Sequence, residues 1–347
     1  MTYLSHDNRK PIPVHRVAVV RPFAQVLTDI GASVERGFRQ AGMPVCALEN
    51  VNNYVPSHRF WKFLVNTANK EGIPDLGFRV GQRFGADCPD PHLTDLLHRS
   101  TTLYQGILKA CELTNKTITH CRLGLLQPPG SRYTYFFHSP SCDADNPAIA
   151  HIGWFGLMHL IGLVREFTGP QWQPNEIGLM TPDTPGRRIR EQFSHTRIRL
   201  SQPYSYIAFE STLLSLPPLR NDAVVPLSPP LPYEPCASDF VGSLKQVLHS
   251  YLQDRDLGLE TAATLCETSK RTLQRKLKAS ETYYSKVLDE VRYHAACAML
   301  QERDIKVADI AHRLRHSDPT HFSRTFRRIA GISPRAYRQQ YYRTADC

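Results

Sequence analysis

Apolar residues recur with a helical period in two segments near the end of the chain, 269–278 and 318–327, which lie 49 residues apart. Each segment opens on a residue that caps helices well, and a proline suits the first helical position of the second copy. Each also holds an apolar pair four residues apart, on one face of the predicted helix. These residues are Ser269, Leu273 and Leu277 in the first copy, and Asp318, Pro319, Phe322 and Phe326 in the second.

The opposite faces of these two predicted helices are polar and mostly basic. A run of cations can equally be a solvated face, but here the cations fall on the faces that the repeat predicts. A shorter helical pattern precedes each copy, at 259–265 and 307–314, so each pair predicts a helix-turn-helix. The side chains expected to reach phosphates and base edges are Arg271, Gln274, Arg275 and Lys278 in the first copy, and Thr320, Ser323, Arg324 and Arg327 in the second.

Residues 283–303 contain neither proline nor glycine and place apolar residues on one side, which predicts a single long helix between the two copies. A rigid connector of this kind can set the distance between two DNA-reading helices. Helices that enter successive major-groove segments on one side of a duplex must lie about 34 Å apart.

Residues 241–341 resemble the DNA-binding domain of the AraC/XylS family of bacterial transcription regulators. The resemblance is carried by four segments in the family's order, 269–277, 309–314, 322–328 and 331–338. The family usually has glycine in each turn, whereas this chain has Cys266-Glu267-Thr268 and Arg315-His316-Ser317. A left-handed residue other than glycine carries a small steric cost in such turns.

The resemblance implies a cytoplasmic, sequence-specific transcription regulator that binds double-stranded promoter DNA as a homodimer. We expect an activator, although the sequence itself does not distinguish activation from repression. It also implies a small-molecule effector of unknown identity and RNA polymerase as further partners. Lys270, His321 and Arg328 join the expected DNA contacts. The alternative is a DNA-tethered protein-interaction module controlled by a partner protein instead of a small ligand.

The earlier part of the chain changes period several times, which is typical of an α+β domain. Helical patterns dominate the first hundred or so residues, including one helix from Pro22 to about Gly42. A hairpin is predicted at 117–126 and 132–138, a buried apolar helix at 148–167, and strands at 176–180, 196–200 and 204–209. We therefore expect helices plus a small, mostly antiparallel sheet, followed by an all-α C-terminal domain with two helix-turn-helix units joined by a long helix.

Proline is dense between residues 225 and 235, which predicts an extended linker. The expected domains are a regulatory domain at 1–224, a linker at 225–238 and a DNA-binding domain at 239–347. The regulatory part faintly resembles the effector-binding, dimerising domains of some AraC-type regulators. Aromatic residues at strand spacing are more often core than pocket, but they are the candidate ligand site: Tyr133, Tyr135, Phe137, His138 and Trp154.

Composition narrows the function classes further. The formal charge of +10 and pI of about 9.2 suit a nucleic-acid partner. Nine scattered cysteines without a C-x-x-C pair predict a reduced, cytosolic protein. No nucleotide-binding loop or hydrolase elbow is present, and His312 and His316 lack further ligands for a metal. We expect no enzymatic activity, no cofactor, no metal site and no membrane association.

Overall fold

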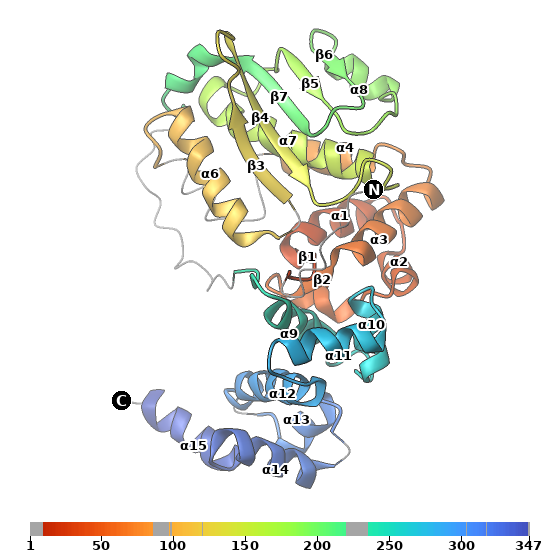
Figure 1. Cartoon of the computed structure of the whole chain (residues 1–347), viewed down its shortest axis with the longest axis vertical. Helices are drawn as coiled ribbons and strands as arrows, with labels where there is room; N and C mark the ends of the chain where they lie inside the picture. Colours follow the sequence, from red (N-terminus) through yellow and green to blue (C-terminus); the bar gives the residue numbers. More distant parts are fainter. Residues whose placement is uncertain are drawn as a thin grey trace. The chain divides into compact units, whose positions relative to one another are not determined.

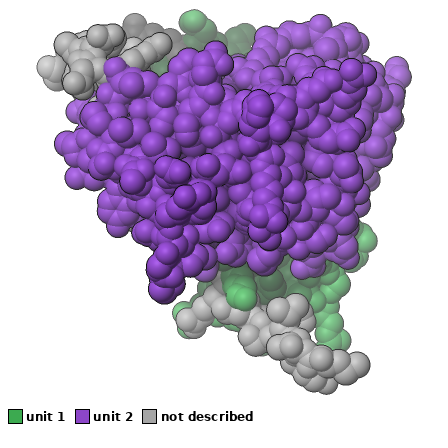
Figure 2. Space-filling model, turned by 90° about the horizontal axis from the view of Figure 1, so that it is seen from above, with its two compact units in different colours: residues 1–12, 44–56, 237–347 green, residues 13–43, 57–236 purple. Residues whose placement is uncertain are grey.

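The structure is a computed structural model that describes residues 10–85, 97, 99–119, 121–219, 235–302, 304–316 and 318–345. The chain forms two compact units (Figure 2). Unit 1 comprises residues 1–12, 44–56 and 237–347, and unit 2 comprises residues 13–43 and 57–236. Most of the predicted linker, 225–238, lies outside the described residues. Residues 44–56 belong to unit 1 together with the C-terminal helices, although the chain on both sides of them belongs to unit 2.

Unit 2 combines helices with a sheet of five strands, as the sequence predicts (Figure 1). Its helices are α1 (Val17–Asp29), α2 (Val34–Ala41), α3 (Ser57–Lys70), α4 (Leu76–Phe84), α6 (Leu103–Thr117), α7 (Ile149–Thr168), α8 (Arg187–Gln192) and the 3-10 helix η2 (Ser211–Ser215). Its strands are β1 (Val14–Arg16), β3 (Cys121–Leu126), β4 (Tyr133–Pro140), β5 (Glu176–Gly178), β6 (Arg197–Arg199) and β7 (Ser205–Glu210).

The five-stranded sheet has the order β3-β4-β7-β5-β6. Strands β3 and β4 form the predicted antiparallel hairpin, with Leu123 opposite His138. Strand β7 pairs antiparallel with both β4 and β5, and only β5 and β6 run parallel. Along β4 the buried and half-buried residues alternate, so Thr134, Phe136 and His138 face the core. The prediction of a small, mostly antiparallel sheet is confirmed.

Helix α7 is the predicted buried apolar helix and forms the centre of the unit 2 core. It packs closely against α4, where two glycines lie at the contact. A Cβ atom on Gly77 would lie 2.1 Å from the carbonyl oxygen of His151, and one on Gly81 would lie 2.6 Å from the Met158 side chain. Glycine at these positions therefore permits the close approach of the two helices.

The prediction of one helix from Pro22 to Gly42 is wrong. Helix α1 begins earlier, at Val17, and includes Pro22. It ends where Gly31 adopts a left-handed conformation, with φ of 81°. The N–H of Gly31 donates to Thr28 and that of Ala32 donates to Leu27, which closes the helix end before α2 begins.

Unit 1 is almost entirely helical. Its elements are the 3-10 helix η1 (Val45–Glu49), strand β2 (Tyr54–Pro56) and helices α9 (Phe240–Tyr251), α10 (Leu259–Leu265), α11 (Lys270–Ala279), α12 (Tyr284–Leu300), α13 (Val307–Arg313), α14 (Pro319–Ala330) and α15 (Pro334–Ala345). Helix α12 is the predicted long connector and lies between α10–α11 and α13–α14 (Figure 1). The two predicted helix-turn-helix units are therefore present. No helix in the described part of the chain is long and apolar enough to span a membrane.

Candidate nucleic-acid interface

Helix α11 begins and packs as its sequence predicts. The side chain of Ser269 accepts a hydrogen bond of 3.1 Å from the Thr272 N–H, which satisfies one of the free donors at the helix start. Leu273 and Leu277 are buried, at 0% and 1% exposure. On the flank of the helix, the Lys276 ammonium lies 4.6 Å from the centre of the Phe240 ring of α9. These contacts fix which face of α11 is turned to solvent.

Helix α14 is built in the same way with larger side chains. The Asp318 carboxylate accepts a hydrogen bond of 2.8 Å from the His321 N–H, and this bond lowers the pKa of Asp318. Phe322 and Phe326 are both buried. The Phe326 ring lies 5.1 Å from Tyr293 of α12, so the connector helix packs directly against α14.

The polar faces of both helices are open to solvent. In α11 the five predicted contact residues, Lys270, Arg271, Gln274, Arg275 and Lys278, are all exposed. In α14 the exposed ones are Thr320, His321, Arg324, Arg327 and Arg328. Ser323 is half-buried, and its hydroxyl donates to the Pro319 carbonyl. The structure thus brings each predicted set together on one helix face.

Two of these cations have acidic neighbours. Lys270 lies 3.0 Å from Glu260, and Arg328 lies 2.5 Å from Asp289 of the connector helix. Within the described ranges, no ion pair is recorded for Arg271, Arg275 or Arg324. These three guanidinium groups can bind phosphate or a guanine edge without first leaving an acidic partner.

The turns that precede α11 and α14 carry the strain that the missing glycines imply. Glu267 has φ of 49° and Arg315 has φ of 54°, both in the left-handed region. In each turn, the following residue donates back into the first helix, Thr268 to Ala263 and His316 to Ala311. Helices α10 and α13 begin 48 residues apart, whereas α11 and α14 begin 49 residues apart. The turn before α14 is therefore one residue longer than the turn before α11.

Arginine side chains bind the second turn to the connector helix and to the segment that follows α9. Arg292 of α12 donates to the Arg315 carbonyl at 3.4 Å. The Arg315 side chain in turn donates to the Gln253 carbonyl, which follows α9, at 3.1 Å. Farther along, Arg338 of α15 donates to the Ile305 carbonyl at 2.6 Å. These bonds join segments that lie far apart in the sequence and stiffen unit 1.

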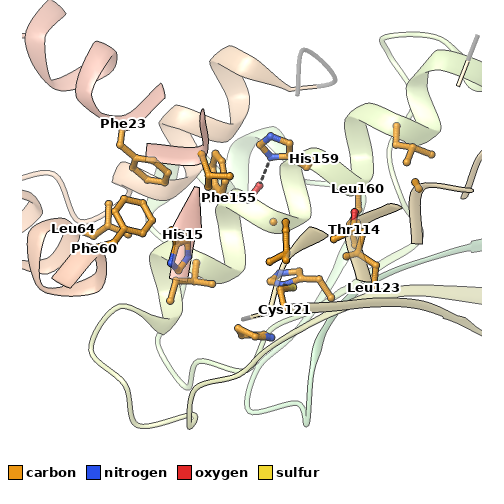
Figure 3. Close-up of a pocket in the computed structure, with 18 residues that line it drawn as sticks. His15, Phe23, Phe60, Leu64, Thr114, Cys121, Leu123, Phe155, His159 and Leu160 are labelled. Atoms are coloured by element: carbon orange, nitrogen blue, oxygen red, sulfur yellow. Dashed lines mark hydrogen bonds between the residues drawn. The ribbon is translucent and has the colours of Figure 1, made fainter. Parts of the chain in front are cut away.

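Unit 2 contains a separate feature, a cavity of about 170 Å³ (Figure 3). Three aromatic rings form part of its wall, with the Phe23 centroid 5.3 Å from that of Phe60 and 4.7 Å from that of Phe155. Two histidines also line the cavity, His138 from β4 and His159 from α7. Burial lowers the pKa of both histidines, that of His138 to about 4, so both rings are neutral at pH 7.

The structure does not bring the five predicted ligand-site residues together. His138 lines the cavity. Tyr133, Tyr135 and Phe137 alternate with the core-facing residues of β4 and therefore point to the other face of the sheet. Trp154 packs in the core, with its ring stacked 6.0 Å from that of Phe193. No group of three or more metal-binding side chains is found among the described residues.

Sequence reasoning did not single out His159, Phe23 or Phe60 as cavity residues. Phe23 and Phe60 look like ordinary core positions on helices that are distant in the sequence. The segment 149–164 is apolar apart from His151 and His159, and these two histidines were the available signal. A buried polar group in such a helix needs a partner or a ligand.

The fold and the exposed basic faces of unit 1 define a DNA-binding protein of the helix-turn-helix class. Residues 262–340 match the model of a helix-turn-helix domain. Residues 31–218, more than half of the chain, match the N-terminal arabinose-binding domain of AraC transcription regulators. The chain belongs to the AraC family of transcription regulators. Because both models describe regulators, the prediction that the chain is not an enzyme is confirmed.

Curated relatives match the C-terminal part. The transcriptional activator NphR of Rhodococcus sp is 33% identical over 100 residues, 29% of this chain and 30% of that protein. The ornithine utilization regulator of Pseudomonas aeruginosa is 38% identical over 81 residues, 23% of this chain and 24% of the relative. The HTH-type transcriptional activator RhaS of Enterobacter sp. is 36% identical over 96 residues, 26% of this chain and 34% of the relative. The matches thus span about a third or less of each relative.

The solved structures that match part or most of the chain include the transcriptional regulator CdpR from Pseudomonas aeruginosa. It is 16% identical with a TM-score of 0.41, over 93% of this chain and 98% of that one. The DNA-binding domain of the global transcriptional factor AdpA, solved in complex with a target DNA, is 26% identical with a TM-score of 0.27. That match covers 29% of this chain and 91% of the other.

Proposed function

We propose that this regulator reads two successive major-groove segments of one promoter site, using α11 for one and α14 for the other. The observation that carries the proposal is the duplication itself. Two capped helices bury equivalent apolar pairs and expose equivalent basic faces, and a continuous helix, α12, joins them. One helix-turn-helix would read only one such segment.

The exposed side chains divide by chemistry into two roles. Arg275 and Gln274 on α11, and Arg324 and Ser323 on α14, contact base edges, where arginine pairs with guanine and glutamine with adenine. Lys278 and Arg328 bind phosphate, because a lysine is a point charge and Arg328 is already oriented by Asp289. The remaining exposed residues of the two faces contact the sugar–phosphate backbone of the DNA.

Unit 2 supplies the regulation. We infer that a small molecule binds its cavity and favours one arrangement of the regulator over another. The proposal also includes activation of transcription, formation of a homodimer and contact with RNA polymerase. Two relatives are named as transcriptional activators, which supports activation. A cytoplasmic location is consistent with the free cysteines at positions 46, 111, 121, 142, 236, 266 and 297.

Selection of bound sequences from random DNA tests this function with the full chain. The expected result is a bipartite consensus with two conserved blocks about 10 base pairs apart. A single block would show that only one helix reads bases. Light scattering of the same protein tests the homodimer. A monomer that binds DNA but responds to no small molecule would favour the alternative, a DNA-tethered module controlled by a partner protein.

A further inference from the structure

The cavity of unit 2 is poorly suited to a sugar, although the matching domain model is named for one. Among the described residues that line it, most are apolar, such as Val19, Leu64, Leu160 and Leu163, and none is Asp, Glu, Lys or Arg. A sugar presents several hydroxyl groups, and each needs a hydrogen-bond partner when buried. An ionised ligand would lack a counter-charge in this wall.

Two of the polar side chains in the wall, His138 and Cys121, have partners within the protein. His138 Nε2 lies 3.3 Å from the Gly153 carbonyl, which only accepts hydrogen bonds, so this nitrogen carries the proton. The other ring nitrogen, Nδ1, lies 3.8 Å from the sulfur of Cys121, whose thiol also lies 3.7 Å from the Arg122 carbonyl. Burial raises the pKa of this thiol to about 12 and keeps it protonated. Both side chains therefore have hydrogen-bond partners inside the protein.

His159 differs, because only one of its ring nitrogens is used. Its Nδ1 donates to the Phe155 carbonyl, one turn earlier in α7, at 2.9 Å (Figure 3). In the neutral ring Nε2 is then a hydrogen-bond acceptor. No donor to this atom is recorded in the described part of the chain. The ring lines the cavity and so offers one acceptor to an incoming molecule.

The size of the cavity limits the ligand further. Its volume of about 170 Å³ is close to that of an apolar cavity of about 150 Å³ that binds benzene in another protein. We propose that this cavity binds a small, uncharged, mostly hydrocarbon molecule about the size of one aromatic ring, with a hydrogen-bond donor that His159 Nε2 accepts. That this molecule acts as the effector rests on the proposed function.

Binding of four probes to the full chain tests the ligand class directly by calorimetry. Benzyl alcohol and toluene share a ring, and only the alcohol has a donor. We expect benzyl alcohol to bind about 3- to 10-fold more tightly than toluene, because one neutral hydrogen bond contributes roughly this ratio of affinities. Benzoate and L-arabinose should not bind. Comparable binding of either one, or no binding of the two uncharged aromatics, would overturn the proposal.

Two substitutions test separately the hydrogen-bond acceptor of His159 and the volume of the cavity. His159→Phe keeps an aromatic ring but removes Nε2, so the preference for benzyl alcohol over toluene should disappear while toluene still binds. An unchanged preference would contradict the role of His159. Val19→Phe fills the cavity and should abolish both. Because a filled cavity can also disturb folding, methyl NMR of the native chain provides an independent test: toluene should shift the resonances of Leu160 and Val19. Unshifted methyls would contradict the site.

DNA binding measured in the same samples separates this inference from the proposed function. If the chain binds toluene but selects no DNA sequence, the cavity assignment stands and the reading of DNA fails. If the chain selects a bipartite DNA site and no uncharged aromatic binds, the reading of DNA stands and the cavity assignment fails. If both bind and neither affects the other, the ligand class stands and its role as effector is contradicted.

Discussion

The backbone N–H of Tyr54 donates a hydrogen bond of 2.9 Å to the hydroxyl of Ser250, although 196 residues separate them. Tyr54 lies in β2 and Ser250 in α9, and both side chains are almost fully buried. The chain continues directly from β2 into α3, which carries Phe60 and Leu64 of the cavity wall. Residues 44–56 thus precede α3 directly in the chain and are hydrogen-bonded to α9, the first helix of the C-terminal region.

Ser250→Ala should loosen the attachment of β2 to α9. A buried N–H without its acceptor costs about 1–3 kcal/mol, which corresponds to roughly 5- to 150-fold faster local opening. Hydrogen exchange of the peptide that contains Tyr54 measures this opening. Ser280→Ala is the matched control, since Ser280 is exposed and bonds only to its own helix. Equal exchange rates in both variants would show that the Ser250 contact is unimportant.

Arg275→Ala and Arg328→Ala should weaken DNA binding in different ways. If Arg275 pairs with guanine, its loss costs about 1–3 kcal/mol on the selected site and relaxes the preference at one base. Loss of Arg328, a phosphate ligand, should weaken all sequences alike and reduce the slope of log affinity against log salt by about 1. Titrations on the selected and scrambled sites at several salt concentrations distinguish the two. A uniform loss for Arg275→Ala would remove it from base recognition.

Glu267→Gly should stabilise the chain. Glu267 adopts a left-handed conformation with φ of 49°, which costs a residue with a side chain about 1 kcal/mol relative to glycine. The gain is reduced because glycine also gains freedom in the unfolded chain, so we expect roughly 0.5 kcal/mol, seen as a higher urea midpoint. Glu260→Gly in the preceding helix α10 is the control and should destabilise. A lower midpoint for Glu267→Gly would contradict the strain.

Acid should destabilise unit 2 through His138. Burial lowers its pKa from 6.5 to about 4, so between these values the unfolded chain binds more protons than the folded one. The stability that the neutral ring contributes is present above pH 6.5 and is lost as the pH falls towards 4. From pH 7 to 5 the loss is about 2 kcal/mol.

His138→Gln should remove that part of the pH dependence. The free energy of unfolding of unit 2, followed by the fluorescence of its buried Trp154, would then fall less between pH 7 and 5 than in the original chain. The same substitution at the exposed His312 of unit 1 is the control. An identical pH profile for His138→Gln and the original chain would show that this histidine is not the titrating group.

Local patterns allowed helices α11 and α14 to be predicted from sequence. Ser269 and Asp318 cap the helices they precede, and Leu273 and Phe322 face the core, because these features depend on residues within one or two helical turns. The left-handed turn at Glu267 followed from the glycine expected there. The hairpin of β3 and β4 was likewise set by strand periodicity and the turn between them.

Features that depend on distant residues escaped prediction. Nothing near Phe23 or Phe60 shows that their rings meet Phe155 of α7, because that contact results from packing of the whole unit. The alternation of β4 could have placed Tyr135 on the face opposite His138, so the aromatic cluster in the sequence was a weaker guide than the period. The break at Gly31 was overlooked because the apolar stripe continues beyond it.

Guanine methylation interference on the selected DNA site most directly tests whether both α11 and α14 read bases. Methylation at N7 blocks contacts in the major groove, so the account predicts two clusters of interfering guanines about 10 base pairs apart. Arg275→Ala should remove interference from one cluster and Arg324→Ala from the other. A single cluster, or two clusters that neither substitution alters, would contradict reading by two helices.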